Sequence, residues 1–420
     1  MPGPCPRGVL PRISLAAALT AALIPLLAPA PERAPERPVT EPVAEALRGP
    51  VRKRAPGQAF RHPGVLLTRA QLDRVRARVA RGAEPWKSAF ETMRSSRYGS
   101  LDYTPAPVAV VRCPPGSRPG HGCVEERRDA IAAYTHALLW YVTRDRAHAR
   151  KAVEIMDAWS AVVEEHTEGN APLQAAWAGS SWARAAEIMR YTYDDWPRGR
   201  VRRTAAMLRT AYLPLTEAGA PDHNGNWDLA MADATMGIAV FLDDEDAFAT
   251  AVRRFRDRVP AYFYLDSDGR LPERPPGSRI RNRADITRYW FGQETFVDGI
   301  AQETCRNFTH VGYGIAATAH IAETAWHQGV DLYDEAGERL RAALAFHARY
   351  QLGDPVPSWL CDGSVKPAMG PDTEVVLNHL RNRRGIRIPD AEQVAREGRY
   401  RGTDNLFVAW EALTHANNPG

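Results

Sequence analysis

Residues 125–143 (EERRDAIAAYTHALLWYVT) and 146–164 (RAHARKAVEIMDAWSAVVE) are two apolar-periodic segments separated by a short polar turn. Apolar residues recur every three or four positions in both, which predicts two amphipathic helices that lie antiparallel. An earlier helix is predicted after Thr68, at LTRAQLDRVRARVARG. Comparable helical segments are predicted at about 173–193, 199–216, 226–241, 244–264, 296–327 and 331–351.

Paired helices dominate this pattern, whereas runs of alternating β-branched residues, which would predict strands, are scarce. The pairing continues over roughly 350 residues, which is much longer than a four-helix bundle. The sequence shows no short period with a repeated signature, so an open repeat solenoid is the less expected architecture. The sequence therefore predicts an all-α protein, an (α/α) toroid or incomplete helical barrel built from paired antiparallel helices.

The composition limits the class of partner. Of 420 residues, 44% are hydrophobic and 25% are charged, which is typical of a globular protein. Only four of the 54 basic residues are lysines, so the other 50 are arginines, and 50 acidic residues balance them along the chain. Nucleic acid is therefore not an expected partner, whereas guanidinium groups suit a locally bound anion such as a carboxylate. The sequence contains no GxSxG, P-loop, GxGxxG or HExxH motif.

The N-terminus is typical of an exported protein. Arg7 and Arg12 precede an apolar run from Ile13 to Leu27, and Ala28-Pro29-Ala30 follows as a small-x-small cleavage pattern. Residues 1–30 are predicted to be a secretory signal peptide, because the run is short for a membrane anchor. Residues 31–60, rich in Pro, Ala, Glu and Arg, are predicted to be a linker, and residues 61–418 the folded domain. We expect an extracellular protein with no membrane span after signal removal.

Four cysteines remain after the predicted cleavage: Cys113, Cys123, Cys305 and Cys361. An even number in an oxidising compartment favours disulfides. Cys113 and Cys123 bracket the loop PPGSRPGHG, so a bridge between them is predicted, and a second between Cys305 and Cys361. Four unrelated buried thiols are the alternative. No CxxC or HxxxH spacing indicates zinc, and no metal site is predicted.

The first candidate site is Pro221 to Trp227 (PDHNGNW), which precedes the apolar helical stretch LAMADATMGIAVFL. Such a loop would lie at a helix N-terminus, where free backbone amides point outward. The alternative interpretation is that Asn226 or Asp222 merely caps the helix.

The second candidate is Gln302 to Tyr313 (QETCRNFTHVGY). If this stretch is helical, Arg306 and His310 are four residues apart, His310 and Tyr313 are three apart, and Glu303 lies one turn before Arg306. One helix face would then carry a cation, an imidazole and a phenol. The alternative is a surface Arg–Glu pair beside a core histidine and tyrosine.

The third candidate is residues 378–383 (NHLRNR), in which Asn378, His379 and Arg383 could form a second wall of a polar cleft. It could equally be a solvated helix end. Tryptophans such as Trp177 could stack on sugar rings, although core packing is their commoner use.

Several segments together resemble the alginate lyase family of polysaccharide lyases, over about residues 62–415. They are APLQAAWAGSSWARAAEIMRYTY, NGNWDLAMADATMGIAVFLDD, DSDGRLPER, QETCRNFTHVGYGIAATAHIAETAWHQG and EVVLNHLRNRRGIRIPD. The resemblance implies an (α/α) toroid with a cleft for polymers that contain uronic acids. It also implies that Asn226, or else Asn224, holds the substrate carboxylate, and that Arg306, His310 and Tyr313 belong to the site.

The function expected from this resemblance is a secreted lyase that cleaves a uronate polysaccharide by β-elimination, without metal or cofactor. Asn226 and Arg306 would neutralise the carboxylate. Tyr313 would be the general acid, and could also be the base. His310 would be either the base or a ligand of the carboxylate. The nearby Arg306 could lower the pKa of both groups. The residues expected to bind substrate are His223, Asn224, Trp227, Trp177, Glu303, Asn378, His379 and Arg383.

Two rival functions and the choice of polymer stay open. A toroidal glycoside hydrolase would need two carboxylates beside the scissile bond. They could come from Asp222, Asp228, Asp233, Glu303 and Glu374. A secreted protein that binds carbohydrate without cleaving it is the other alternative. The polymer could be alginate, glucuronan or a glycosaminoglycan.

Overall fold

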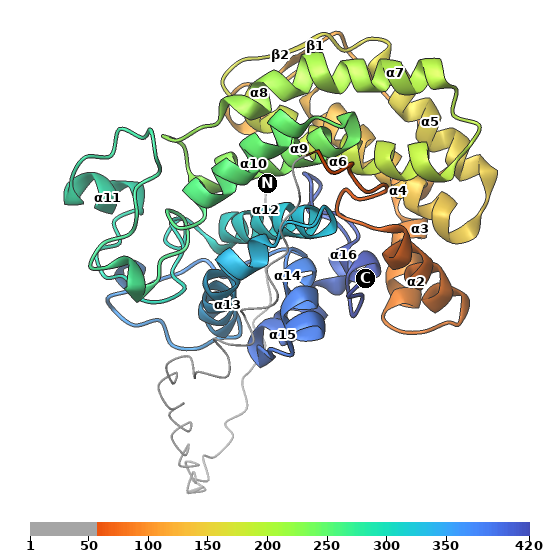
Figure 1. The fold of residues 1–420 in the computed structure, drawn as a ribbon. Helices are drawn as coiled ribbons and strands as arrows, with labels where there is room; N and C mark the ends of the chain where they lie inside the picture. The colour runs from red at the N-terminus through yellow and green to blue at the C-terminus, as the bar shows by residue number, and fades with distance from the viewer. Residues whose placement is uncertain (1–56) are drawn as a thin grey trace, which may run out of the picture. The chain divides into compact units, whose positions relative to one another are not determined.

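Helices make up most of the regular structure in residues 57–420, the part of the chain that this computed structural model describes (Figure 1). The first half contains α2 (Arg69–Ala80), α3 (Trp86–Ser95), α4 (Cys123–Thr143), α5 (Arg146–Ser160), α6 (Ala171–Thr192), α7 (Arg198–Met207), α8 (Leu213–Ala218) and α9 (Gly225–Leu242). The second half contains α10 (Glu245–Arg258), α11 (Arg283–Tyr289), α12 (Phe308–His327), α13 (Leu332–Gln351), α14 (Glu374–Asn378), α15 (Pro389–Gly398) and α16 (Glu411–Thr414).

Other regular structure is short. Two strands, β1 (Val110–Arg112) and β2 (Glu165–Thr167), pair in parallel with Val111 opposite His166. Two π-helical turns, Leu208–Tyr212 and His379–Arg383, extend α7 and α14. The 3₁₀ turns are Arg97–Gly99, Pro115–Ser117, Asp266–Asp268, Cys361–Gly363 and Arg399–Arg401.

The helices form two layers. Helices α4, α6, α9 and α12, here called the inner helices, pack side by side in that order. Each has a partner outside it, because α5 packs on α4, α8 on α6 and α9, α10 on α9, and α13 on α12. This alternation of inner and outer helices confirms the predicted all-α (α/α) toroid.

Burial explains the two layers. In α6, every residue from 173 to 189 is buried, so this helix is covered on all sides. Gly179 brings α6 close to α9, since a Cβ there would lie 3.3 Å from the Ile238 side chain. The outer helix α10 instead buries one stripe, with Phe248, Val252 and Phe255 facing inward. A helix that is buried all round belongs inside, and an amphipathic helix covers it.

The turns from α4 to α5 and from α9 to α10 have the same local structure. Arg144 and Asp243 end α4 and α9 with positive φ angles of 61° and 57°. The next residues, Asp145 and Asp244, cap α5 and α10 by accepting hydrogen bonds from backbone N–H groups. A left-handed residue followed by an aspartate cap reverses the chain within two residues.

The helix predicted at 296–327 is wrong over its first third. Helix α12 begins only at Phe308, and its N-cap Asn307 is extended, with φ at 177°. Segment 146–164 also ends early, at Ser160, because β2 follows. The helix predicted at 244–264 likewise ends early, at Arg258, and the other inner and outer helices lie close to their predicted ranges.

Both predicted disulfides are present. Cys113–Cys123 closes the loop between β1 and α4, and Cys305–Cys361 joins the segment before α12 to the segment after α13.

The predicted signal peptide, and the linker up to residue 56, lie outside the described residues. Folded structure begins slightly before the predicted boundary, because Phe60 is buried against Phe248. From residue 57 onward, no helix has the length and apolar character needed to span a membrane.

Candidate active site

The N-terminal ends of all four inner helices meet at one cavity of about 810 Å³. Val124, Arg127 and Arg128 reach it from α4, Leu173 and Trp177 from α6, Asn226 and Trp227 from α9, and His310 and Tyr313 from α12. Loops supply Arg97, the disulfide-closed residues 115–118, Gly169, Asn170, His223, Arg306 and residues 404–406. Because helix N-termini carry partial positive charge, four of them together favour an anion.

Charged side chains strengthen this preference. Five arginines line the cavity, whereas Asp404 is the one acidic residue among the described lining. The arginines are Arg97, Arg118, Arg127, Arg128 and Arg306. A concave surface with this imbalance concentrates anionic ligands.

Tight packing fixes the start of α9. Gly225 lies against the Tyr262 ring so closely that a Cβ would be 2.1 Å from it, and Gly314 of α12 meets the same ring at 2.3 Å. The Gly225 N–H donates to Gln302 Oε1 at 3.0 Å. The glycine between the two asparagines therefore lets α9 begin beside Tyr262, which carries Asn226 into the cavity.

The loop before α9 places three further predicted residues. His223 stacks on Trp227, with ring centroids 4.3 Å apart, and both line the cavity. Asn224 accepts a hydrogen bond from Gln302 Nε2 at 3.2 Å and is not part of the cavity lining. His223 and Trp227 therefore stay candidates for substrate contact, whereas Asn224 holds the loop.

The Glu303 carboxylate links Asn226 and Arg306, because it accepts a hydrogen bond from each of them. Its Oε2 accepts from Asn226 Nδ2 at 2.6 Å, and its Oε1 accepts from Arg306 Nη1 at 2.7 Å. Tyr262 also donates to Oε2, at 3.0 Å. Glu303 is fully buried and absent from the lining, so its predicted contact with substrate is wrong: it positions the two groups that face the cavity.

Arg306, His310 and Tyr313 meet at the cavity by a different route from the predicted one. Arg306 precedes α12, because Cys305 is tied to Cys361 and Asn307 is the cap. The three residues therefore do not share one helix face, although all three line the cavity.

Asn307 determines which nitrogen of His310 carries a proton. The His310 backbone N–H donates to Asn307 Oδ1 at 3.0 Å, which identifies that atom as the amide oxygen. His310 Nδ1 lies 2.7 Å from the same oxygen, so it must be the protonated nitrogen. Nε2 is then left with a free lone pair. Burial, with the nearby Arg306, lowers the pKa of His310 to about 4, so the ring is neutral at neutral pH.

Tyr313 has the opposite shift. Burial, with Asp404 and Asp372 nearby, raises the pKa of its phenol above the ordinary value, and Arg127 and Arg306 oppose this only in part. Arg306 thus acts to lower the pKa of both groups, as expected, but the net shift is downward only for His310. The Tyr313 hydroxyl forms no hydrogen bond within residues 57–420, and its ring lies 5.5 Å from that of His310. It is a protonated group open to a ligand.

The third predicted site does not belong to this cavity. Asn378 Nδ2 donates to the Asn418 carbonyl at 2.7 Å, and His379 stacks on Tyr333 at 3.7 Å. Arg383 pairs with buried Glu323 at 2.6 Å. The prediction that these side chains form a second cleft wall is wrong, because the C-terminal residues and α13 cover them.

Sequence analysis missed one wall of the cavity. Ser117, Arg118, Arg127, Arg128 and Asn170 also line it. The available signal was the pair Arg127-Arg128, which opens a predicted helix directly after the disulfide-closed loop. Within the described part of the chain, no cluster of three His, Cys, Asp or Glu side chains could hold a metal.

An (α/α) toroid whose cationic cavity joins an amide, a guanidinium, an imidazole and a phenol has the architecture of a polysaccharide lyase. The family model described as alginate lyase matches residues 118–357, more than half of the chain. The protein therefore belongs to the alginate lyase family of polysaccharide lyases.

Solved structures agree on the fold. An alginate lyase from Bacteroides ovatus is similar at 15% identity and a TM-score of 0.55, over 84% of this chain and 99% of that one. Alginate lyase A1-III from Sphingomonas species A1 is similar at 15% identity and a TM-score of 0.51, over 76% and 88%. A variant of A1-III complexed with tetrasaccharide has 16% identity and a TM-score of 0.52, over 75% and 86%. A search of curated proteins found no match.

Proposed function

We propose that this protein cleaves a polysaccharide containing uronic acids by β-elimination, leaving an unsaturated uronate at the new chain end. The observation that carries the proposal is the meeting of Asn226, Arg306, His310 and Tyr313 in one arginine-lined cavity. The likeness to alginate lyases supports an alginate-like substrate.

The first requirement of the reaction is to stabilise negative charge. Loss of the C5 proton moves charge onto the uronate carboxylate, and donors already in place lower the cost. Arg306 uses one Nη1 bond to Glu303, and the rest of its fork faces the cavity. Asn226 is held in the same way by Glu303. Both can therefore hold the carboxylate without moving.

The second requirement is a base and an acid. His310 is neutral with a free Nε2, so it is suited to take the C5 proton. The electron pair then forms the C4–C5 double bond, and the C4–O bond breaks. Tyr313, whose raised pKa keeps the phenol protonated, supplies the proton that the leaving glycosidic oxygen needs.

The hydrolase alternative lacks its carboxylates. Four of the five candidates form ion pairs with arginines away from the cavity lining: Asp222 with Arg279, Asp228 with Arg258, Asp233 with Arg184, and Glu374 with Arg399. Glu303, the fifth, is buried beneath Arg306. No two carboxylates within the described lining could flank a glycosidic bond.

Incubation with alginate, polyglucuronate and hyaluronan tests the proposal. A lyase produces a conjugated double bond, so ultraviolet absorbance should rise together with new reducing ends. Reducing ends without absorbance would indicate hydrolysis instead. Arg306→Lys keeps the charge but loses the planar fork, so turnover should fall well below wild type with unchanged circular dichroism. Arg256→Lys, an exposed outer-helix residue, is the matched control.

We also propose export. The apolar run Ile13–Leu27 and the two disulfides support it, since disulfides persist in oxidising compartments. Intact-mass measurement of protein recovered from culture medium tests this: the chain should begin after Ala30, and a secreted chain that retains Met1 would contradict it.

A further inference from the structure

Arg127 is a buried cation without a carboxylate partner. It is 8% exposed and lines the cavity from the first turns of α4. Its Nη1 donates to the Ser117 hydroxyl at 3.2 Å, and its guanidinium lies 5.1 Å from the centre of the Trp177 ring. No carboxylate among the described residues lies within ion-pair distance of it. Removing such a charge from water is costly unless an anion compensates it.

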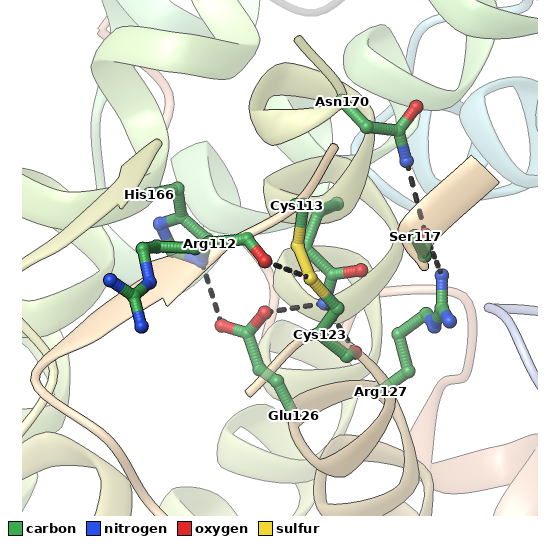
Figure 2. Close-up of a disulfide and its surroundings, with 9 residues drawn as sticks. Arg112, Cys113, Ser117, Cys123, Glu126, Arg127, His166 and Asn170 are labelled. Carbon is green, nitrogen blue, oxygen red and sulfur yellow. Dashed lines mark hydrogen bonds and ion pairs between the residues drawn. A yellow bond between two sulfur atoms is a disulfide. The ribbon is translucent and has the colours of Figure 1, made fainter. Parts of the chain in front are cut away.

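Neither neighbouring acid, Glu126 nor Asp404, forms an ion pair with Arg127, although Asp404 Oδ2 has no hydrogen-bond partner among the described residues. Glu126 accepts from Tyr212 and Gln174 and lies 2.8 Å from His166 Nε2. Figure 2 shows Glu126 directed toward His166, while Arg127 extends to the other side, toward Ser117. Asp404, which shares the cavity, accepts through Oδ1 from three backbone N–H groups, those of residues 406–408. Arg127 is thus left facing the cavity.

The surroundings of Arg127 form a built site. Ser117 is held by the loop that the Cys113–Cys123 disulfide closes, and Asn170 Nδ2 donates to its hydroxyl at 3.4 Å (Figure 2). Asn170 is 6% exposed and also lines the cavity. A guanidinium, a hydroxyl and an amide in fixed positions suit a carboxylate.

We propose that Arg127, Ser117 and Asn170 form a second carboxylate subsite, which binds the uronate on the other side of the scissile bond from Arg306. This inference rests on the proposed function. Arg127 and Arg306 both line the cavity with Tyr313, and they come from opposite ends of the row of inner helices, since Arg127 lies in the first turns of α4 and Arg306 directly precedes α12. In the elimination, the Tyr313 phenol lies at the glycosidic oxygen, which joins two sugar rings. One ring presents its carboxylate to Arg306, and the other ring faces Arg127.

The subsite specifies the class of substrate. Two carboxylate sites across one glycosidic bond fit a polymer of consecutive uronates, such as alginate or glucuronan. A glycosaminoglycan, in which uronates alternate with amino sugars, fills only one of them. Polyuronates should therefore be cleaved with a much higher kcat/KM than hyaluronan.

Binding to a non-cleaving variant tests the subsite. In the Tyr313→Phe background, calorimetry with tetrasaccharides of mannuronate, guluronate and glucuronate identifies the probe that binds best. Adding Arg127→Met, which keeps the chain on Trp177 but removes the charge, should weaken that binding about 10- to 100-fold. Arg202→Met on α7 removes an exposed charge outside the cavity and should leave affinity unchanged.

Thermal unfolding separates a ligand site from a structural role. A binding-site cation that lacks a partner in the free protein destabilises it, so Arg127→Met should melt at or above the wild-type temperature. A fall in melting temperature, or unchanged tetrasaccharide affinity, would overturn the subsite while leaving the lyase proposal intact. Hyaluronan cleaved as readily as the best polyuronate would overturn the substrate class. If wild type neither binds nor cleaves any uronate, both proposals fail.

Discussion

Asn307 accepts two hydrogen bonds from His310 with a single oxygen, at 3.0 Å from the backbone nitrogen and 2.7 Å from ring Nδ1. One side chain thus starts α12 and fixes the tautomer of the imidazole. Because the acceptor is a neutral amide, it adds no negative charge that would favour the imidazolium. The ring keeps a low pKa and a free Nε2.

Asn307→Asp should raise the pKa of His310, because a carboxylate beside the ring stabilises the protonated form. Aspartate also caps helices, so the fold should be kept. Protonated His310 cannot act as a base. The acidic limb of the kcat/KM profile, expected near pH 4 in wild type, should therefore move upward by about one to two pH units.

The control for this variant is Asp145→Asn, the reverse exchange at the cap of α5, which lies outside the cavity. It should leave the pH profile in place. An acidic limb that Asn307→Asp does not move would show that His310 is not the base.

Tyr313→Phe removes only the phenolic oxygen and keeps the ring against Phe407, whose ring centroid lies 6.2 Å away. If Tyr313 is the acid, the loss should affect kcat more than KM, by about 10²- to 10⁴-fold. Tyr264→Phe, whose hydroxyl donates to the Gly269 carbonyl, is a matched control outside the cavity. Turnover of the Tyr313 variant within a few-fold of wild type would assign proton transfer to another group.

Periodicity could predict the toroid because the packing of its helices depends on apolar spacing. The helices on either side of Arg144 and Asp243 each begin within two residues of the predicted start. It failed at residues 296–307, where the spacing still fits a helix. There the Cys305–Cys361 bridge and the extended Asn307 cap determine the backbone, and neither leaves a periodic signal.

Residue types alone could not distinguish an arginine that lines the cavity from an arginine held in a buried ion pair. Arg306 and Arg383 both follow polar residues in candidate site segments, yet Arg306 lines the cavity and Arg383 is enclosed with Glu323. The difference depends on which distant segment covers each side chain. Arg127 was missed for the same reason, since a charge at a helix start is usually solvated.

Glu303→Gln tests the link between the two carboxylate-binding groups. A glutamine offers one oxygen and one NH₂, so either Asn226 or Arg306 would face a donor instead of an acceptor. One of the two then loses its fixed position, and kcat/KM should fall about 10- to 100-fold. Glu335→Gln, which removes an exposed ion pair with Arg256, should change neither kcat nor KM. Full activity of Glu303→Gln would show that Asn226 and Arg306 hold their positions without this carboxylate.

The buried carboxyl of Asp372 should make the stability of the folded protein depend on pH. Its carboxyl packs against Gly312, next to Tyr313, and Oδ1 has no hydrogen-bond partner among the described residues. Burial, with Glu411 nearby, raises its pKa from an ordinary value of 3.8 to about 7. The folded protein therefore binds a proton between about pH 4 and pH 7 that the unfolded chain has already released. Stability should fall as pH rises through this window and then level off.

Asp372→Asn has the same shape and no charge to lose, so it should match wild type near pH 4 and become more stable toward pH 8. The size of the pKa change, from 3.8 to about 7, sets a gain of about 4 kcal/mol in the free energy of unfolding. Asp404, whose pKa burial also raises to about 7, would still contribute its own pH dependence in the variant. Urea unfolding at pH 4, 6 and 8 measures the difference, with the exposed Asp102→Asn as control. Parallel stability curves for wild type and Asp372→Asn would mean that the Asp372 carboxyl is already ionised at pH 4, despite its burial beneath α12.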